Sequence, residues 1–495
     1  MKHAHHLRAA AEMLRQNVYP HLDEVGHAHL LVLDDEADDG SILDARVEHN
    51  LDPALDYLKQ LPRQIVDLWS TRISAPGTVH SNLKATYIGY TATPQANFLQ
   101  SDQNPLAPKD FVCALRTPSD VGELLPRAST YREPVGLSAF YTGGDAFYRR
   151  LTGAAALTVP QTSSCLQDVA TPAPYQRGVW IADAVRSYLV AGAVRLYRGA
   201  PRPATVNDVD FASRHEAVAA SPPPHTMLLH PSSSVDDHFV AAAELLAWGH
   251  AVPIDEGRRL LAAGVRHLDI DAISADMDRE PSRWTHWLSS FGASAAELRS
   301  AYSLEVSRET PAPGAWPEVR AILVEELLPH VKLAIINSNP DADDKPEFGP
   351  RLASNGRWTA AGDLLTIFVS GNIMARGLTL EGLTTTLFLR MSDAPVADTQ
   401  MQMQRWFGYR GSYLELCRVF APAQQLALFQ QYHGTDEALR RQIVHEMNEA
   451  GESAPTPLVL EGAGFAATAK IAGVAKVPLC PGASLFVDHV NDGGE

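Results

Sequence analysis

The chain has 495 residues and a formal net charge of −17, which excludes the strongly basic composition of general polyanion-binding proteins. A hydrophobic content of 45% and a charged content of 20% are typical of a globular protein with two or three domains. The four scattered cysteines indicate neither a zinc site nor a disulfide framework, and no apolar run is long enough to predict a membrane span. We therefore expect a cytoplasmic protein without a membrane partner.

The N-terminal region predicts a strand–helix–strand unit. Apolar residues at helical spacing predict an opening helix: Leu7, Ala11, Leu14 and Val18. A buried strand is predicted at "HLLVLD" (29–34), followed by a helical stretch at 53–70 and a β-rich run at "TYIGY" (86–90). This order predicts a βαβ unit with a parallel sheet, within a first lobe at residues 1–125.

Residues 126–222 are expected to form a mainly helical linking region. Its clearest helix spans 178–199 and is closed by Gly199 and Pro201. The Pro-rich segment at 221–225 predicts a boundary.

A second α/β lobe is predicted at 223–435, with a helical insertion at about 236–330. Its five β-rich runs predict one parallel sheet: "TMLLH", "KLAIINS", "LTIFVSG", "TTLFLR" and "RVFAP". Residues 436–495 form an extension with no motif of its own.

Acidic side chains crowd the end of the first predicted strand, at Asp34, Asp35, Glu36 and Asp38. Like charges at this density cost free energy unless a cation compensates them, and a metal ion carrying a phosphate would do so. The alternative is a strand that ends in an acidic, solvated turn. "LLVLDDEAD" resembles the acidic strand of superfamily-two helicases. The resemblance implies that Asp35 holds magnesium, that Glu36 is the base for the attacking water, and that Asp38 links to the next motif.

The next motif is "YTATP", in which Thr91 and Thr93 resemble the helicase coupling motif. The resemblance implies that their hydroxyls bond the acidic motif and report the nucleotide state. The alternative is a turn in which the threonines satisfy local backbone groups. The order of the two motifs and their spacing of about 55 residues favour the helicase interpretation.

Two further segments resemble helicase motifs. "ARGLTLEGL" implies nucleotide contacts from Arg376 and Gly377, and "QMQRWFGYRG" implies one from Gln402. On a predicted helix, Gln402 and Arg405 share a face at i, i+3. Either Arg405 or Arg410 would act as an arginine finger on the developing γ-phosphate charge. An isolated arginine is otherwise most often a solvated surface charge.

Together, these motifs resemble the Z-one (Z1) domain family over residues 1–435. These are bacterial helicase-like ATPases that carry an endonuclease label and are associated with DNA repair or phage defence. The resemblance implies an α/β fold of two RecA-like parallel-sheet lobes with helical insertions, ATP and Mg²⁺ as cofactors, and DNA as a partner. The sequence departs from the family at Gln404, where glycine is usual.

The sequence contains no P-loop, G-x-x-x-x-G-K-S/T, and no Gly-Lys pair. In two-lobed helicases this loop precedes the acidic strand and supplies backbone N–H groups and a lysine to the phosphates. Only 33 residues precede Asp34, so we expect an N-terminally truncated first lobe, with the P-loop supplied by an upstream segment or a partner subunit. The alternatives are a scaffold or regulatory subunit that has lost nucleotide binding, and a DNA endonuclease. For the endonuclease, Asp341, Asp343 and Lys345 are weak candidates, because an exposed acidic loop is the more usual form of such a segment.

Overall fold

The structure is a computed structural model of the 495-residue chain. It describes residues 3–42, 60–70, 82–100, 104–114, 141–144, 146–150, 166–168, 177–302, 310–371, 380–449, 459, 462 and 464–470. The chain divides into two compact units. Unit 1 comprises Met1–Leu115, Asp393–Gln402 and Gly434–Glu495, and unit 2 comprises Arg116–Ser392 and Met403–His433. Helix α13 (Ala423–Glu449) supplies residues to both.

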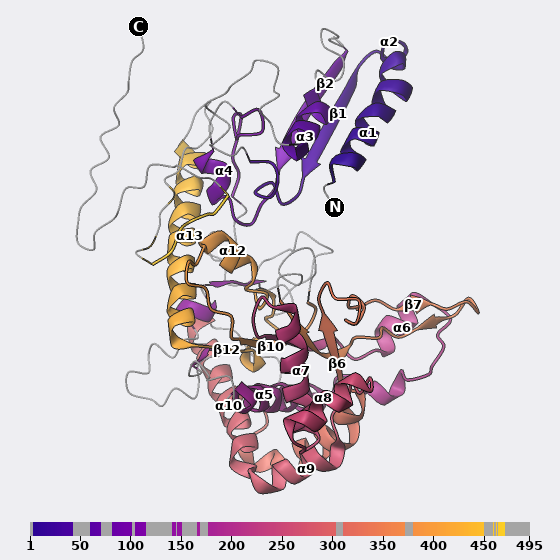
Figure 1. Cartoon of the computed structure of the whole chain (residues 1–495), viewed down its shortest axis with the longest axis vertical. Helices are drawn as coiled ribbons and strands as arrows, with labels where there is room; N and C mark the ends of the chain where they lie inside the picture. Colours follow the sequence, from indigo (N-terminus) through magenta and orange to yellow (C-terminus); the bar gives the residue numbers. More distant parts are fainter. Residues whose placement is uncertain are drawn as a thin grey trace, which may run out of the picture. The chain divides into compact units, whose positions relative to one another are not determined.

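Unit 1 contains the predicted βαβ arrangement. Strand β1 (Ala28–Asp34) pairs in parallel with β2 (Leu83–Gly89), and α3 (Gln60–Ser70) lies between them in the chain. Helix α1 (Ala4–Asn17) packs against α3 beside the two strands (Figure 1). A small core built on Ile65, Val66 and Leu106 joins these elements. Unit 1 also contains three short helices: α2 (Leu22–Val25), α4 (Gln95–Leu99) and α12 (Ala397–Gln402).

One face of β1 is open to solvent, so the prediction of a fully buried strand is wrong. Exposure alternates along the strand, and Leu31 and Leu33 are 53% and 56% exposed. Parallel sheets normally have both faces covered, because the crossover connections place helices on them. The alternation leaves an apolar surface on unit 1.

Unit 2 is built on a six-stranded sheet in which every pairing is parallel. In spatial order its strands are β4 (Leu166–Asp168), β12 (Arg418–Ala421), β10 (Leu383–Phe388), β5 (His225–His230), β9 (Leu365–Ser370) and β6 (Lys332–Ile336). The five predicted strands are all present in this sheet. Strands β5, β9, β10 and β12 are buried along their whole length, as expected for parallel strands that are covered on both faces. An α/β fold with a parallel sheet is therefore confirmed.

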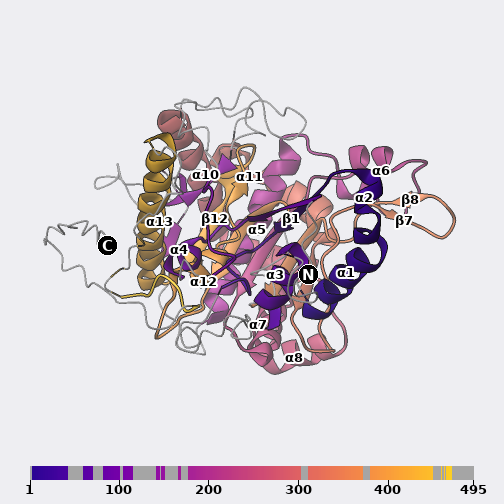
Figure 2. The ribbon, with the colours of Figure 1, turned by 90° about the horizontal axis from the view of Figure 1, so that it is seen from above.

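Helices of unit 2 cover this sheet. Helix α5 (Arg177–Tyr197), which the sequence placed in a linking region, packs on β10 and β5 and ends before Gly199 in the left-handed region, φ 88°. Helix α7 (Val235–Gly249) contacts β6 and β9 and lies beside α8 (Ile254–Ala262) in both views (Figures 1 and 2). The predicted insertion also contains α9 (Ile270–Arg279), α10 (Pro281–Tyr302) and α11 (Trp316–Ile322).

Smaller elements of unit 2 are α6 (Arg214–Ala220) and two antiparallel pairs: β3 (Tyr141–Thr142) with β11 (Gly408–Tyr409), and β7 (Arg351–Leu352) with β8 (Trp358–Thr359). Within the described ranges, no helix has the length and apolar character needed to cross a bilayer.

Candidate functional site

The acids after β1 have different surroundings. Asp34 is buried, and its carboxylate accepts hydrogen bonds from the hydroxyls of Tyr87 and Ser41, each at 2.6 Å. Burial, together with the charge of Asp34, raises the pKa of Tyr87 well above its usual value. Asp35 is exposed, and its Oδ1 accepts from the backbone N–H of Glu36 at 3.1 Å. Asp34 therefore joins the two strands, whereas the Asp35 carboxylate faces solvent.

Backbone contacts hold this acidic turn against the segment that follows β2. The N–H of Tyr90 donates to Asp34 and the N–H of Ala37 donates to Tyr90, both at 2.8 Å. Between them, Glu36 adopts the left-handed conformation, φ 55°, which is uncommon for a residue other than glycine. Such a conformation costs about 1 kcal/mol or more and persists where neighbouring contacts enforce it. The carboxyl ends of two adjacent parallel strands are thereby joined.

Asp38 is the centre of a buried polar cluster in unit 1. Its side chain is 0% exposed, and its two carboxylate oxygens accept from Thr91 Oγ1 at 2.8 Å and Thr93 Oγ1 at 2.9 Å. Gln402, the last residue of α12, donates from Nε2 to Asp38 at 3.0 Å and to Thr93 at 2.9 Å. Four residues that were selected from three separate sequence motifs thus meet at one point.

Lys470 completes this cluster, and the sequence analysis missed it. Its Nζ donates to Asp38 and lies 3.4 Å from Oδ2 of Asp398, a second side chain that is 0% exposed. Burial would raise the pKa of Asp38, but the hydrogen bond and charge of Lys470, aided by Thr91 and Thr93, outweigh it and lower that pKa. Asp38 is therefore ionised at neutral pH.

Main-chain pairing brings Lys470 to this position. Residues 395–398 run beside 465–468, with the N–H of Ala397 donating to Ala466 at 2.8 Å. Thr468 Oγ1 donates to Asp398 at 2.8 Å and also accepts from the N–H of Lys470 at 3.0 Å. No local sequence signal marks a lysine that is paired across 432 positions.

A second acid in unit 1, the half-buried Asp436 on α13, has the opposite shift. Burial is the main cause that raises its pKa to about 6, although Arg440 and a hydrogen bond from Gln95 Nε2 at 3.4 Å act against it. A folded-state pKa above the usual 3.8 means that the folded chain binds this proton more tightly. Stability from this group is present below about pH 4 and is lost as the pH rises through 6.

We accordingly expect Asp436→Asn to stabilise unit 1 at alkaline pH only. The shift from 3.8 to about 6 corresponds to roughly 3 kcal/mol, and partial exposure of the residue reduces this to about 2 kcal/mol at pH 8. Urea unfolding at pH 3.5 and pH 8 measures the difference, with the exposed Asp255→Asn as control. A variant no more stable than the parent at pH 8 would contradict this assignment.

The arginine-rich segment belongs to unit 2 and is not helical. Helix α12 ends at Gln402, a turn follows, and Gly408 in β11 has φ 138°, which no helix contains. The predicted helix face shared by Gln402 and Arg405 is therefore wrong. Arg405 lies half-buried in the turn. Arg376 and Gly377 lie outside the described residues.

Arg410 is a buried brace. It donates from Nη1 to the Tyr413 hydroxyl at 2.6 Å and from Nε to the Trp406 carbonyl at 3.3 Å. Nη2 donates to three more carbonyls at 3.2 to 3.4 Å, those of Arg405, Leu380 and Phe407. With these contacts the guanidinium holds its own loop together.

A comparison with known protein families identifies one domain of the chain. Residues 270–460 match the family model of the Z1 domain. The chain therefore carries a Z1 domain. The match covers four strands of the sheet and the arginine-rich segment, whereas the acidic turn and Thr91 to Thr93 precede it. No curated protein and no solved structure matches the chain.

Two details of the Z1 domain bear on the sequence predictions. Gln404, where the sequence departs from the family pattern, is buried and accepts a hydrogen bond from the Tyr148 hydroxyl at 2.7 Å. Asp343, a weak nuclease candidate, accepts from Arg266 Nε at 3.1 Å and from the N–H of Ile335 in β6 at 2.7 Å. Its carboxylate therefore holds the loop after β6. Among the described residues, no group of three or more His, Cys, Asp or Glu side chains is arranged to hold a metal ion.

The brace in the Z1 domain leads to a stability prediction. Arg410→Lys is expected to lower the free energy of unfolding by about 2 to 4 kcal/mol. Lysine keeps the positive charge, but its single ammonium group cannot reach all the oxygens to which Nε, Nη1 and Nη2 of the planar guanidinium donate. Arg258→Lys, an exposed arginine paired with Asp255, should change stability by less than about 0.5 kcal/mol. Urea unfolding compares them, and equal effects would show that Arg410 is not a brace.

Proposed function

We propose that the chain is a helicase-like, nucleic-acid-dependent ATPase with two RecA-like lobes, acting on DNA in bacterial repair or phage defence. The observation that carries the proposal is the pair of hydrogen bonds from Thr91 and Thr93 to Asp38. They join a coupling motif to an acidic motif at the carboxyl ends of adjacent parallel strands, where open α/β sheets bind ligands. The Z1 domain at residues 270–460 agrees with the family resemblance on which the proposal rests.

Asp35 fits a magnesium ion that arrives with a triphosphate. Mg²⁺ is commonly held by one or two carboxylates, with waters and phosphate oxygens as the remaining ligands. A single exposed carboxylate at a strand end meets that requirement, whereas Asp34 is buried and its Oδ2 already accepts hydrogen bonds from Tyr87 and Ser41. When bound, the metal ion would neutralise charge on the phosphate oxygens.

The chain's own residues would have separate roles in ATP hydrolysis. Glu36, next to Asp35, would orient and deprotonate the attacking water. Asp38 would pass any movement of the acidic turn to the end of β2 through its bonds to Thr91 and Thr93, and Gln402 would add a third connection to the same cluster. The half-buried Arg405 would supply positive charge to the γ-phosphate.

The sequence contains no P-loop to hold the phosphates. We propose that an upstream segment or a partner subunit supplies it and covers the exposed face of β1. Two observations agree with a segment or subunit that covers this face of β1. Leu31 and Leu33 are exposed on it, and parallel sheets are normally covered on both sides.

ATP turnover tests the proposal. We expect negligible hydrolysis by the purified 495-residue chain with Mg²⁺, ATP and single-stranded DNA, because catalysis in this class is mostly positioning and charge stabilisation. Turnover should return when a P-loop segment is fused upstream or added as a subunit. Robust DNA-stimulated turnover by the chain alone would contradict the need for a cradle. Absence of turnover and of any nucleotide-induced thermal shift in the completed protein would favour the non-catalytic scaffold.

A further inference from the structure

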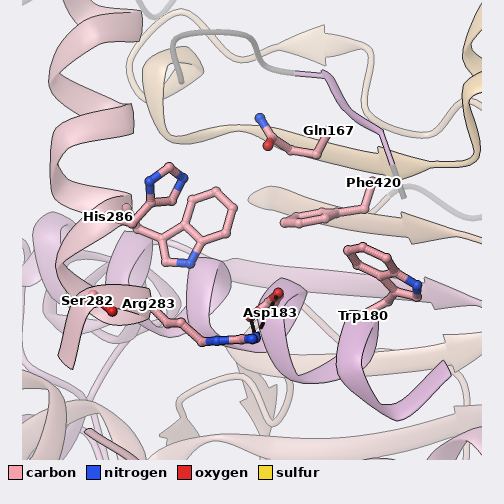
Figure 3. Close-up of a pocket in the computed structure, with 8 residues that line it drawn as sticks. Gln167, Trp180, Asp183, Ser282, Arg283, His286 and Phe420 are labelled. Atoms are coloured by element: carbon pink, nitrogen blue, oxygen red, sulfur yellow. Dashed lines mark hydrogen bonds and ion pairs between the residues drawn. The ribbon is translucent and has the colours of Figure 1, made fainter. Parts of the chain in front are cut away.

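A separate pocket lies entirely within unit 2. It has a volume of about 330 Å³ and lies between α5, α10 and the neighbouring strands β4 and β12. None of the residues that line it belongs to the proposed ATPase motifs. Figure 3 shows Trp180 and Phe420 beside the open space, with Gln167 and the Arg283–Asp183 ion pair on opposite sides in this view.

Aromatic rings form the fixed part of the wall. Trp287 and Phe420 are buried and meet edge to face, with ring centroids 5.6 Å apart and an interplanar angle of 64°. Trp180, on α5, is partly exposed and lines the same pocket. Rings held in this way offer flat faces and edges at little entropic cost, which suits a flat aromatic ligand.

The polar lining suits a ligand that both donates and accepts hydrogen bonds. Burial, followed by the nearby charge of Arg418, lowers the pKa of His286, so its imidazole is neutral at pH 7 with one donor and one acceptor. Gln167 contributes an amide and Ser282 a hydroxyl to the lining.

The charges disfavour a cationic ligand. Asp183 already accepts from Arg186 at 2.6 Å and from Arg283 at 3.1 Å, so its carboxylate needs no further cation. The Arg283 side chain is 45% exposed, and no hydrogen bond within the described ranges involves its Nη2. A guanidinium with a spare edge is well suited to phosphate.

We propose that this pocket binds one nucleotide unit, with the base against the aromatic wall at Trp180 and the phosphate at Arg283. The volume of 330 Å³ is in the range of small-molecule sites and accommodates a base with its sugar. The nucleotide comes from one of two sources, a free mononucleotide or an unpaired base of a single strand. A duplex keeps its bases stacked and does not provide the ligand.

Binding measurements without Mg²⁺ separate this pocket from the ATPase motifs. The probes are AMP and adenosine, followed by calorimetry, and a fluorescein-labelled 20-nucleotide deoxyadenosine strand, free and in duplex, followed by anisotropy. Trp180→Ala should weaken whichever probe binds by about tenfold, the size of one lost base–aromatic stack. Trp358→Ala is the matched control, since Trp358 is also partly exposed in unit 2 and does not line the pocket.

A second variant tests the phosphate contact. Arg283→Gln should weaken AMP binding severalfold and leave adenosine binding unchanged. Binding of AMP alone identifies a free nucleotide as the ligand, and binding of the single strand alone identifies an unpaired base. The proposal is overturned if no probe binds, if Trp180→Ala and Trp358→Ala behave alike, or if the duplex binds as tightly as the single strand. Because these assays need neither ATP nor a P-loop, their failure is distinct from failure of the ATPase proposal.

Discussion

Lys470→Met is expected to lower the free energy of unfolding of unit 1 by about 3 kcal/mol at pH 7. Removing one partner of a buried ion pair leaves an uncompensated charge, which typically costs 3 to 5 kcal/mol, and the 18% exposure of the lysine side chain argues for the lower end. Both carboxylates that face Lys470, those of Asp38 and Asp398, are 0% exposed. Urea unfolding measures the loss, with the exposed Lys109→Met as control.

The pH dependence provides a second measure of the same contact. The folded-state pKa of Asp38 is lowered, so its stabilising contribution is present above the usual pKa of 3.8 and is lost as the pH falls through the lower folded value. In Lys470→Met the main causes of that lowering are gone and burial raises the pKa instead. The difference in stability between parent and variant should therefore be largest at neutral pH and shrink toward pH 3.

A double-mutant cycle isolates the interaction. Asp38→Asn in the Lys470→Met background removes the stranded charge and should recover about half of the lost stability, because replacing both partners costs less than replacing one. Additive effects of the two substitutions, or a Lys470→Met variant as stable as Lys109→Met, would show that the lysine does not hold the acidic turn.

Glu36→Gln is expected to reduce ATP turnover at least 100-fold in the protein completed with a P-loop, consistent with loss of a general base. The substitution keeps the size of the side chain and the left-handed backbone, φ 55°, so nucleotide affinity should change little. Steady-state turnover and a nucleotide-binding titration measure the two quantities separately.

Asp39→Asn is the matched control for this experiment. Asp39 is an exposed acid in the same turn and loses the same charge, so the control separates base chemistry from a general change in the potential around magnesium. Turnover by Glu36→Gln comparable with that of the control would remove Glu36 from the mechanism and favour another residue as the base.

The sequence alone determined those features that depend on local pattern. Five β-rich runs, bounded by Gly, Pro, Ser or Asn, predicted five strands of the unit 2 sheet, because such runs are typical of buried parallel strands. The order of strand, helix and strand also determined the parallel pairing of β1 and β2. The resemblance to helicase motifs implied that the threonines after β2 bond the acidic motif, and Asp38 does accept hydrogen bonds from Thr91 and Thr93.

Only the tertiary structure decided which distant groups complete these motifs. Lys470 contacts Asp38 across 432 positions, and the pocket combines residues from two helices and two strands, so no local pattern signals either. Burial made Arg410 a brace, because its guanidinium is surrounded by carbonyls that the sequence does not reveal. The residue type determines which chemistry a side chain can perform. Its neighbours in the fold determine whether a charged side chain is exposed to solvent, paired with an opposite charge or hydrogen-bonded to backbone carbonyls.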